Sequence, residues 1–248
     1  MKQDMTVKEI NKKEAQDFFI QYEHLGNCGL GVWHYGLYNG DELISVVSFG
    51  ATNFNPNRSS LGRIAKECDL KIIQLTRGGT KFDAPKNIPS YTISRAFIEL
   101  KKRFGCCLIA AYSDTKWNEI GTIYQASNFL YLGLTNPKDQ SNYVINGEVI
   151  SGWMVRKKYG TRDIRQLSLM VDSIDKFPLT RKHFYVFPNT SKKKRKMVIK
   201  ALQDDIQPYP KRKDLNVGSM VEFHRNDIIG FRQRQGSVVH TNEVTMQG

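Results

Sequence analysis

The sequence predicts a mixed α/β fold in which helices flank a mostly antiparallel sheet. Asn39-Gly40 and Asn146-Gly147 each stand between β-rich runs, a pattern typical of tight hairpins. Between these turns, segments with helical spacing alternate with apolar runs that suit strands. The chain has 248 residues, of which 40% are hydrophobic, so it can bury a sizeable core. Helices layered on a mixed sheet satisfy these observations together.

The N-terminal third is expected to hold a helix, a hairpin and a second helix. Thr6 and Glu9 fit a capping box, and apolar residues follow at roughly helical spacing, which predicts a helix over residues 7–22. The hairpin on Asn39-Gly40 follows. A weaker pattern predicts a short helix over residues 59–67.

The middle of the chain is expected to alternate strand and helix. The run "DLKIIQLTRGG" reads as a strand, and "SYTISRAFIELKKRF" reads as a helix with Ser90 as its N-cap. The continuous apolar run "CCLIAAYSD" suits a strand that is buried on both faces. The stretch "GTIYQASNFLYLG" then predicts a short helix that runs at once into a strand, and "YVINGEVISGWMV" predicts the second hairpin.

The composition changes beyond residue 165. "TRKHFYVFP" predicts a basic-aromatic strand, and "NTSKKKRKMVIKAL" predicts a lysine-rich helix that the prolines of "QPYPKRK" end. The apolar pattern is sparse from Asp214 onward. We therefore expect a catalytic core over residues 1–165, a basic extension packed on it over 166–213, and a poorly ordered tail over 214–248.

Charge and cysteine content restrict the partners and the compartment. There are 37 Lys and Arg against 24 Asp and Glu, and the formal net charge of +13 favours a polyanionic partner, above all nucleic acid. The four cysteines show no CxxC spacing and read as reduced residues of a cytosolic protein. We expect neither a signal peptide nor a membrane span, and therefore a cytoplasmic location. The sequence does not predict an oligomeric state.

Tyr124 lies on the short helix of "GTIYQASNFLYLG", where it is open to two interpretations. On the residues alone, a half-buried core tyrosine is the simpler one. However, the order of "LTRGG", a helix, "LIAAYSD" and this stretch resembles the GNAT acetyltransferase superfamily. There, the helix after the fourth strand caps the pyrophosphate of the cofactor, and a later helix carries a tyrosine. The resemblance implies an acetyltransferase-like core over roughly residues 5–135, with Tyr124 as a candidate general acid.

A closer resemblance extends over most of residues 20–213. The chain is similar to the Mom family of phage DNA adenine-modification proteins, which convert adenine N6 in duplex DNA to a carbamoylmethyl derivative and so shield phage DNA from restriction. If the chain is encoded by a phage, the expected location is the cytoplasm of the bacterial host. The resemblance implies His24, Asp114 and Tyr124 as catalytic residues. It is carried by the order of the blocks "QYEHLG", "LTRGG", "PKNIPS", "AAYSD", "GTIYQASNFLYLG", "RKKYGT" and "KHFYVFP…PYPKRK".

The resemblance also implies a donor site, for which the candidates are Arg77, Gly78, Asn87 and Ser90. Acetyl-CoA or another acyl donor is expected. The loop "GTKFDAPKNIPSYT" lacks the glycine-rich turn that lets a backbone approach a pyrophosphate. Simple acetyl transfer would also leave N-CO-CH3, whereas the family product is N-CH2-CO-NH2. The family product needs a bond from N6 to the methylene carbon and a second nitrogen. An aminoacyl-tRNA donor, or a redox step with a metal such as iron, would each meet that need. No residue is assigned to a metal.

Each candidate also has a plain structural interpretation. His24 closes a helix, where it could only complement the dipole. Arg77 could form a surface salt bridge, and Ser90 could only cap its helix. Asp114 follows an apolar strand, at the position where α/β sheets place ligand-facing residues, but it could equally cap the next helix.

The basic extension is the expected contact with double-stranded DNA. Its lysines would contact phosphates while nearby aromatic residues pack or stack, although such a run is often only a solvated face. The candidates are Lys182, His183, Tyr185, Lys192, Lys193, Lys194, Arg195 and Lys196. Two other functions stay open, namely an acetyl-CoA-dependent N-acetyltransferase acting on a small-molecule or protein amine, and a nucleic-acid-binding protein without catalysis.

Overall fold

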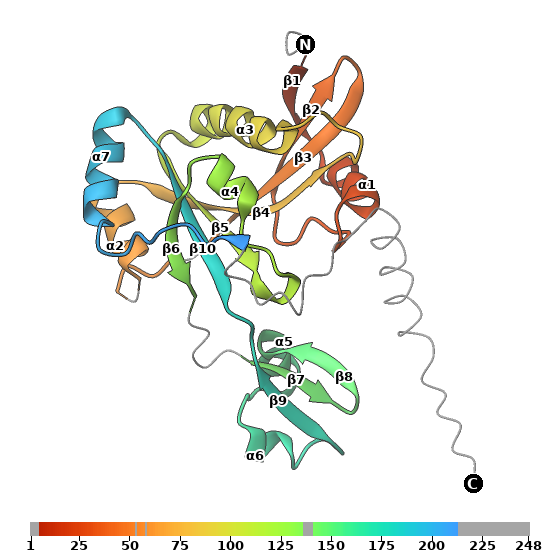
Figure 1. Cartoon of the computed structure of the whole chain (residues 1–248). Helices are drawn as coiled ribbons and strands as arrows, with labels where there is room; N and C mark the ends of the chain where they lie inside the picture. The colour runs from red at the N-terminus through yellow and green to blue at the C-terminus, as the bar shows by residue number, and fades with distance from the viewer. Residues whose placement is uncertain (1–4, 53, 58, 136–140, 213–248) are drawn as a thin grey trace.

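The structure is a computed structural model, and it describes residues 5–52, 54–57, 59–135 and 141–212. A seven-stranded sheet with the order β1-β2-β3-β4-β5-β10-β6 forms its body (Figure 1). The predicted mixed, mostly antiparallel sheet is confirmed, because β4 and β5 are its parallel pair and the other neighbours run antiparallel. The strands are β1 (Met5–Ile10), β2 (Trp33–Asn39), β3 (Glu42–Ala51), β4 (Lys71–Thr80), β5 (Cys107–Asp114), β6 (Leu130–Leu134) and β10 (Lys182–Asn189).

Helices cover both faces of this sheet. On one face α3 packs against the core formed by Ile109 and its neighbours, and on the other α2 and α7 pack against Leu108 and Val186. Alternate residues of β5 thus serve opposite layers, and Cys107 to Ala111 are all fully buried, which confirms the predicted two-sided strand. The helices of this main body are α1 (Lys12–Tyr22), α2 (Ser60–Glu67), α3 (Ile88–Phe104), α4 (Thr122–Ala126) and α7 (Lys192–Ala201), and the 3-10 turn η1 (Thr115–Trp117) follows β5.

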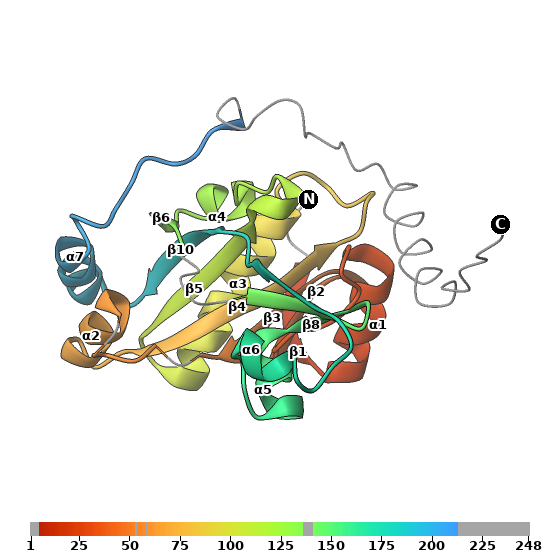
Figure 2. The same cartoon turned by 90° about the horizontal axis from the view of Figure 1, so that it is seen from below.

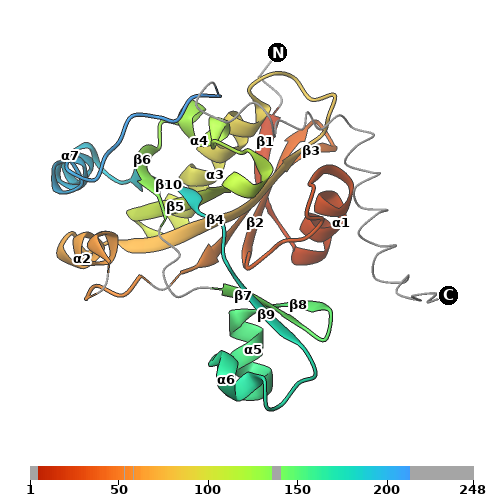
Figure 3. The same ribbon diagram turned by 60° about the horizontal axis from the view of Figure 1, so that its bottom comes forward.

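A small second unit is inserted between β6 and β10. Its three-stranded sheet has the order β8-β7-β9, and the Asn146-Gly147 turn joins the first two strands as predicted. We call it the inserted domain, residues 141–178, and Figures 1 and 3 show it below the main sheet. Its elements are β7 (Ser141–Ile145), β8 (Glu148–Ser151), α5 (Gly152–Tyr159), α6 (Ile164–Leu167) and β9 (Ile174–Pro178).

The start of the chain corrects one prediction. Residues 7–22 do not form one helix, because Met5–Ile10 is a strand that pairs with β2 from Met5↔Asn39 to Ile10↔His34. The side chain of Asn11 caps α1 by accepting from Glu14 N–H, so the Thr6–Glu9 pair is not a capping box. The hairpin expected at Asn39-Gly40 is confirmed, because β2 pairs with β3 across this turn. The short helix expected over residues 59–67 is confirmed as Ser60–Glu67.

The start of α3 corrects a second prediction. The helix begins at Ile88, and Asn87 rather than Ser90 occupies the N-cap position. Pro89 sits in the first turn, where its fixed φ and missing N–H are tolerated. Ser90 therefore lies inside the helix, and its hydroxyl donates to the Asn87 carbonyl oxygen at 3.1 Å.

The segment expected to pack on the core contributes a strand within it. β10 pairs with β5 from Lys182↔Asp114 to Asn189↔Cys107, and with β6 on its other side. The chain then continues into the predicted lysine-rich helix α7, which lies beside α2 and away from the inserted domain (Figures 1 and 2). The tail expected over residues 214–248 lies outside the described residues.

Candidate active site

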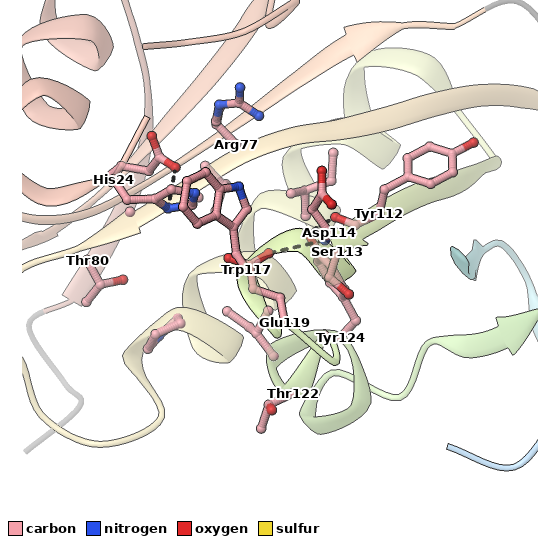
Figure 4. Close-up of a pocket in the computed structure, with 18 of the residues that line it drawn as sticks. His24, Arg77, Thr80, Tyr112, Ser113, Asp114, Trp117, Glu119, Thr122 and Tyr124 are labelled. Atoms are coloured by element: carbon pink, nitrogen blue, oxygen red, sulfur yellow. Dashed lines mark hydrogen bonds and ion pairs between the residues drawn. The ribbon is translucent and has the colours of Figure 1, made fainter. Parts of the chain in front are cut away.

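The parallel strands β4 and β5 separate at one end and leave a cavity between them. Their pairing runs from Lys71↔Cys107 to Leu75↔Ala111, whereas β4 continues to Thr80 and β5 to Asp114. The pairing of β3 with β4 shifts here, because Ser48 pairs with Arg77 and Phe49 with Leu75, which leaves Thr76 of β4 as the extra residue of a bulge. The resulting cavity measures about 870 Å³ and is shown in Figure 4.

Side chains from separate parts of the chain converge on this cavity. They come from the end of α1, from β4, from the start of α3, from β5 and the loop after it, from α4 and from the start of β10. Those that can exchange protons or donate hydrogen bonds include His24, Arg77, Tyr112, Ser113, Asp114, Glu119, Tyr124 and Lys182. Predicted catalytic residues from three distant blocks, His24, Asp114 and Tyr124, therefore share one cavity.

Asp114 ends β5 and is held from the strand that returns from the inserted domain. Its carboxylate accepts a hydrogen bond from the Thr180 hydroxyl at 2.9 Å and lies 3.4 Å from the Lys182 ammonium. Its main-chain N–H donates to a carboxylate oxygen of Glu119 at 3.4 Å. Two carboxylates thus lie side by side at the rim of the cavity.

Glu119 is a candidate that the sequence analysis missed. Although part of its side chain is open to the cavity, desolvation by the surrounding protein raises the pKa of the carboxyl group. The hydrogen bond from Asp114 N–H opposes this rise, and the neighbouring Asp114 charge adds to it. A carboxyl group whose pKa is raised in a cavity keeps its proton to a higher pH than an ordinary glutamate, which suits it to accept or return a proton. Its place in an irregular loop, five residues after a strand end, gave no sequence signal.

Tyr124 points its phenol along the open edge of β5. Its ring packs against Phe129 and Tyr185, with centroids 5.3 Å from each, and its hydroxyl donates to the Tyr112 carbonyl oxygen at 3.3 Å. Burial strongly raises the pKa of the phenol, so it stays protonated at any neutral pH. Gly121 is the N-cap of α4 and has a φ of +68. A β-carbon at this position would lie only 2.5 Å from the Tyr185 ring, so a glycine is needed for Tyr124 to pack against Tyr185.

His24 is oriented by the residue before it. Its Nδ1 lies 3.1 Å from a carboxylate oxygen of the buried Glu23, whose other oxygen accepts from the main-chain N–H groups of Leu25 and Gly26. The imidazole ring meets Trp117 edge-on at 5.6 Å, across the cavity from α1 to the loop after β5 (Figure 4). A carboxylate at Nδ1 fixes the tautomer that leaves Nε2 as the basic nitrogen.

Arg77 brings a cation to the same cavity. Its guanidinium donates to the Thr76 carbonyl oxygen at 2.9 Å and reaches the Asn27 side chain at 3.5 Å. Its Nε is buried and has no hydrogen-bond partner among the described residues. A buried N–H without an acceptor is costly, so an acceptor supplied by a ligand would complete this group.

The other predicted donor-binding residues are only partly at the cavity. Gly78 lines it, whereas Asn87 and Ser90 are not among the lining residues; Pro89, which was not predicted, does line it. The first turn of α3 offers few free N–H donors, because Pro89 has none and Ile88 N–H already donates to the Pro85 carbonyl oxygen.

The predicted DNA contacts fall into two groups. Lys182 lines the cavity, and Lys192 to Lys196 lie on α7, where Lys194 donates to the Cys68 carbonyl oxygen. His183 and Tyr185 correct the prediction, because they are only 6% and 0% exposed. His183 pairs with the Tyr131 hydroxyl at 2.8 Å, so these two side chains build the core rather than a surface.

No group of His, Cys, Asp or Glu able to hold a metal ion is present among the described residues. Within the same part of the chain, no helix is long and apolar enough to cross a membrane.

The fold and the cavity can now be compared with those of known proteins. The strand order and the separated β4 and β5 define a mixed α/β protein with a cavity at the open end of its parallel strand pair, beside Tyr124 on the helix before β6. The model of the Mom protein family matches residues 4–211, and the chain belongs to that family. A curated relative, the methylcarbamoylase Mom of Escherichia phage Mu, is 28% identical over 117 residues, which are 46% of this chain and 46% of that protein. The match thus spans about half the length of the relative.

Solved structures with a similar outline are acetyltransferases. One is the Bacillus subtilis acetyltransferase in complex with CoA, with 13% identity, a TM-score of 0.39, and coverage of 74% of this chain and 97% of that one. Another is a GNAT family acetyltransferase from Elizabethkingia anophelis with acetyl-CoA bound, with 8% identity, a TM-score of 0.41, and coverage of 75% and 99%. At these low TM-scores, the description of the fold rests on strand order and the open β4–β5 edge.

Proposed function

We propose that the chain is a DNA-modifying transferase that converts adenine N6 in duplex DNA to a carbamoylmethyl derivative and so protects phage DNA from restriction. One observation carries the proposal: in a member of the Mom family, the cavity between β4 and β5 gathers His24, Asp114 and Tyr124 beside the cation of Arg77.

The target base has to leave the helix to reach this cavity. Adenine N6 takes part in base pairing, and stacked neighbours restrict its approach, so the nucleotide is flipped out of the duplex. A volume of about 870 Å³ lies within the range of small-molecule sites and can take a purine together with part of a donor. Trp117 supplies aromatic surface against which a flipped base can stack.

Two groups can accept the proton that N6 loses on attack. Asp114 is fixed at the rim by Thr180, and His24 is fixed in its tautomer by Glu23. An exocyclic aromatic amine is a weak nucleophile, so a positioned base is needed. Glu119, beside Asp114, offers a further place for the proton before it returns to solvent. Tyr124 serves on the other side of the reaction, because a phenol held in its protonated form can donate to a leaving group.

The cavity fits the acyl-bearing part of a donor better than a pyrophosphate. The open edges of β4 and β5 can hydrogen-bond an extended chain, and Arg77 Nε can donate to a carbonyl or phosphate oxygen. The start of α3 has few free N–H groups, as Pro89 illustrates. Acetyl-CoA and an aminoacyl-tRNA therefore both stay candidate donors, which would supply the activated acyl carbon. Iron is not assigned to any residue of this chain.

Atom counting favours a donor that already carries nitrogen. Attack of N6 on the carbonyl carbon of a glycyl ester would break the ester bond, release the donor as an alcohol and give N-CO-CH2-NH2. This product is an isomer of the proposed N-CH2-CO-NH2, so the proposed product requires a further rearrangement that exchanges the positions of N6 and the glycyl nitrogen without a change of oxidation state. An acetyl donor gives N-CO-CH3, which lacks the nitrogen. Exact mass separates the acetyl product from the other two, and fragmentation separates the isomers.

Basic residues provide the affinity for DNA. We assign phosphate contacts to Lys182 at the cavity and to Lys192–Lys196 on α7, apart from Lys194, whose ammonium is engaged by the main chain. Replacing Lys192, Lys193 and Lys196 by glutamine should weaken binding to all DNA sequences alike and flatten the salt dependence by about 0.9 log unit for each phosphate that is no longer neutralised. An unchanged slope would show that α7 is only a solvated face.

The decisive experiment is nucleoside analysis. DNA from cells that express the chain is digested, and the nucleosides are resolved by mass spectrometry, with Asp114→Asn as the inactive control. Carbamoylmethyl-adenine is expected with the wild-type chain only. If adenine stays unmodified although the soluble protein binds DNA and host extract is added, the proposal is wrong. Acetyl transfer to a small amine without DNA affinity would instead identify an ordinary N-acetyltransferase.

A further inference from the structure

The inserted domain leaves the main sheet at the rim of the cavity. β10 begins at Lys182, which pairs with Asp114 at the end of β5. Thr180, in the connection from the inserted domain, donates to the Asp114 carboxylate, and the Thr115 hydroxyl donates to the Arg181 carbonyl oxygen at 2.6 Å. The domain is thus tied to the end of the strands that carries the candidate catalytic residues (Figures 1 and 3).

This domain folds around a core of its own. Tyr143, Ile150, Val155 and Leu167 are buried together, and Tyr143 donates to the Arg162 carbonyl oxygen at 2.9 Å. None of these residues lines the cavity. The domain is therefore not needed to complete the main core, and its outer surface is free to contact a partner.

The outward face of α5 combines an exposed tryptophan with consecutive cations. Trp153 is 63% exposed, and the Lys157 ammonium lies over its ring at 5.4 Å, one helical turn on. Arg156 and Lys158 flank that lysine, and all three cations are exposed. α5 contains no acidic residue, and no ion pair within the described part of the chain neutralises these cations.

Such a surface matches the chemistry of a nucleic acid. Cations without carboxylate partners attract phosphates, and an exposed aromatic ring can pack on a base or sugar. A tryptophan is usually more buried than this one, and its exposure beside three cations suits a surface that contacts a partner. An acidic protein would satisfy the cations as well, but a net charge of +13 and the cavity beside the domain favour DNA.

We propose that the exposed surface of α5, with Trp153 and Lys157 near its centre and Arg156 and Lys158 at its two edges, contacts duplex DNA next to the target adenine. The proposal rests on the proposed function for the identity of the DNA substrate. It gives the inserted domain the task of holding the flanking duplex while the flipped base enters the cavity. Trp153 packs on a sugar or a base exposed by flipping, and the three cations neutralise nearby phosphates.

Two variants separate these contributions by their salt dependence. The triple variant Arg156→Gln, Lys157→Gln, Lys158→Gln should bind a duplex more weakly and flatten the log-log salt slope by about 0.9 for each phosphate that it leaves without a cation. Trp153→Ala should lower affinity roughly 10-fold with an unchanged slope, because stacking releases no counterions. Binding is measured by fluorescence anisotropy with a labelled duplex over a range of salt concentrations.

A matched control removes the same net charge elsewhere. Lys8, Lys12 and Lys66 are exposed on β1, at the start of α1 and on α2, and their replacement by glutamine also lowers the net charge by three. The control should retain the wild-type slope to within the small effect of net charge. Thermal unfolding of all variants should match the wild type, because the replaced side chains are exposed.

The outcomes distinguish this surface from the reaction itself. If the α5 triple variant binds DNA like the control, or if the wild-type chain does not bind DNA, the proposed surface is wrong. If the α5 triple variant loses affinity, but DNA from cells that express the wild-type chain contains no modified adenine, the proposed surface is supported and the proposed reaction is wrong. If the wild type modifies adenine and the α5 variant does so equally well at sub-saturating DNA, the reaction stands and the surface fails.

Discussion

Replacing Tyr124 by phenylalanine separates its proposed chemical role from its structural one. The substitution removes only the hydroxyl, so the ring contacts to Phe129 and Tyr185 are retained. The interaction that disappears is one hydrogen bond of 3.3 Å to the Tyr112 carbonyl oxygen. A neutral hydrogen bond contributes about 0.5–1.5 kcal/mol, and water in the cavity can replace this one, so the free energy of unfolding should fall by about 1 kcal/mol or less.

The effect on rate should be much larger. A general acid contributes roughly 10²- to 10⁴-fold, and we expect a loss of about 10²-fold, which corresponds to about 2.7 kcal/mol in activation free energy. The rate is followed as modified adenine formed over time at saturating DNA, with nucleosides separated by mass spectrometry. Unfolding in denaturant gives the stability of the same protein.

Tyr143→Phe is the matched control for Tyr124→Phe. It also removes a hydroxyl that donates to a main-chain carbonyl oxygen, that of Arg162, but away from the cavity. This control should lose a similar free energy of unfolding and little activity at saturating DNA. Full activity of Tyr124→Phe would show that the phenol is not the acid, and unfolding of that variant alone would show that its role is structural.

Three further predictions concern other residues of the main body. Arg77→Lys keeps the charge but removes the buried Nε donor, so the KM for the donor should rise about 10-fold in a donor titration; an unchanged KM would exclude a donor contact. Desolvation raises the pKa of Glu119 in the folded protein, so ionising this carboxyl group costs stability once the pH exceeds the pKa of an ordinary glutamate. Glu119→Gln should therefore raise the melting temperature at pH 7 but not at pH 4, and equal melting curves at pH 7 would contradict this. Gly121→Ala places a β-carbon 2.5 Å from the Tyr185 ring at a φ of +68, and it should cost roughly 2–4 kcal/mol in denaturant unfolding. Gly147→Ala, at φ +81 with nothing within 4 Å, should cost only about 1 kcal/mol, and equal losses would show that crowding does not matter at Gly121.

The sequence predicted most elements of the main body because local patterns decide them. The Asn39-Gly40 hairpin and the buried strand ending at Asp114 follow from turn chemistry and a continuous apolar run. The prediction of a helix was wrong for residues 7–10, because Val7 and Ile10 fit helical spacing but the segment can also form a strand, in which these two side chains lie on opposite faces of the sheet. Pairing with β2 decides between the two, and no local signal reports that partner.

The place of β10 could not be predicted for a related reason. Its own pattern marks a strand, but its partners β5 and β6 are separated from it by the whole inserted domain. The same long-range pairing buries His183 and Tyr185, which local composition had suggested as surface residues. Strand order depends on contacts between distant segments, and short-range patterns do not specify them.

The residues of the candidate site were likewise predicted only where a local pattern marks them. Asp114 and Tyr124 were predicted because they stand at a strand end and on a short helix within recognisable blocks. Glu119 and Thr180 were not, because each lies in a loop. Glu119 lines the cavity from the loop after β5, and Thr180 contacts Asp114 from the connection to β10. Their roles depend on geometry that the chain acquires only on folding.

The length of β10 determines how a duplex can meet both basic surfaces. Lys182 and Asn189 are seven residues apart in an extended strand, which places α7 about 24 Å from the cavity end at ~3.4 Å per residue. Along B-DNA that distance corresponds to about seven base pairs. α7 therefore cannot contact the phosphates next to an adenine held in the cavity, whereas the inserted domain is tied to the cavity rim by Thr180 and Arg181. Contacts that help to extract the base are expected from the inserted domain, and α7 can only add affinity farther along the duplex.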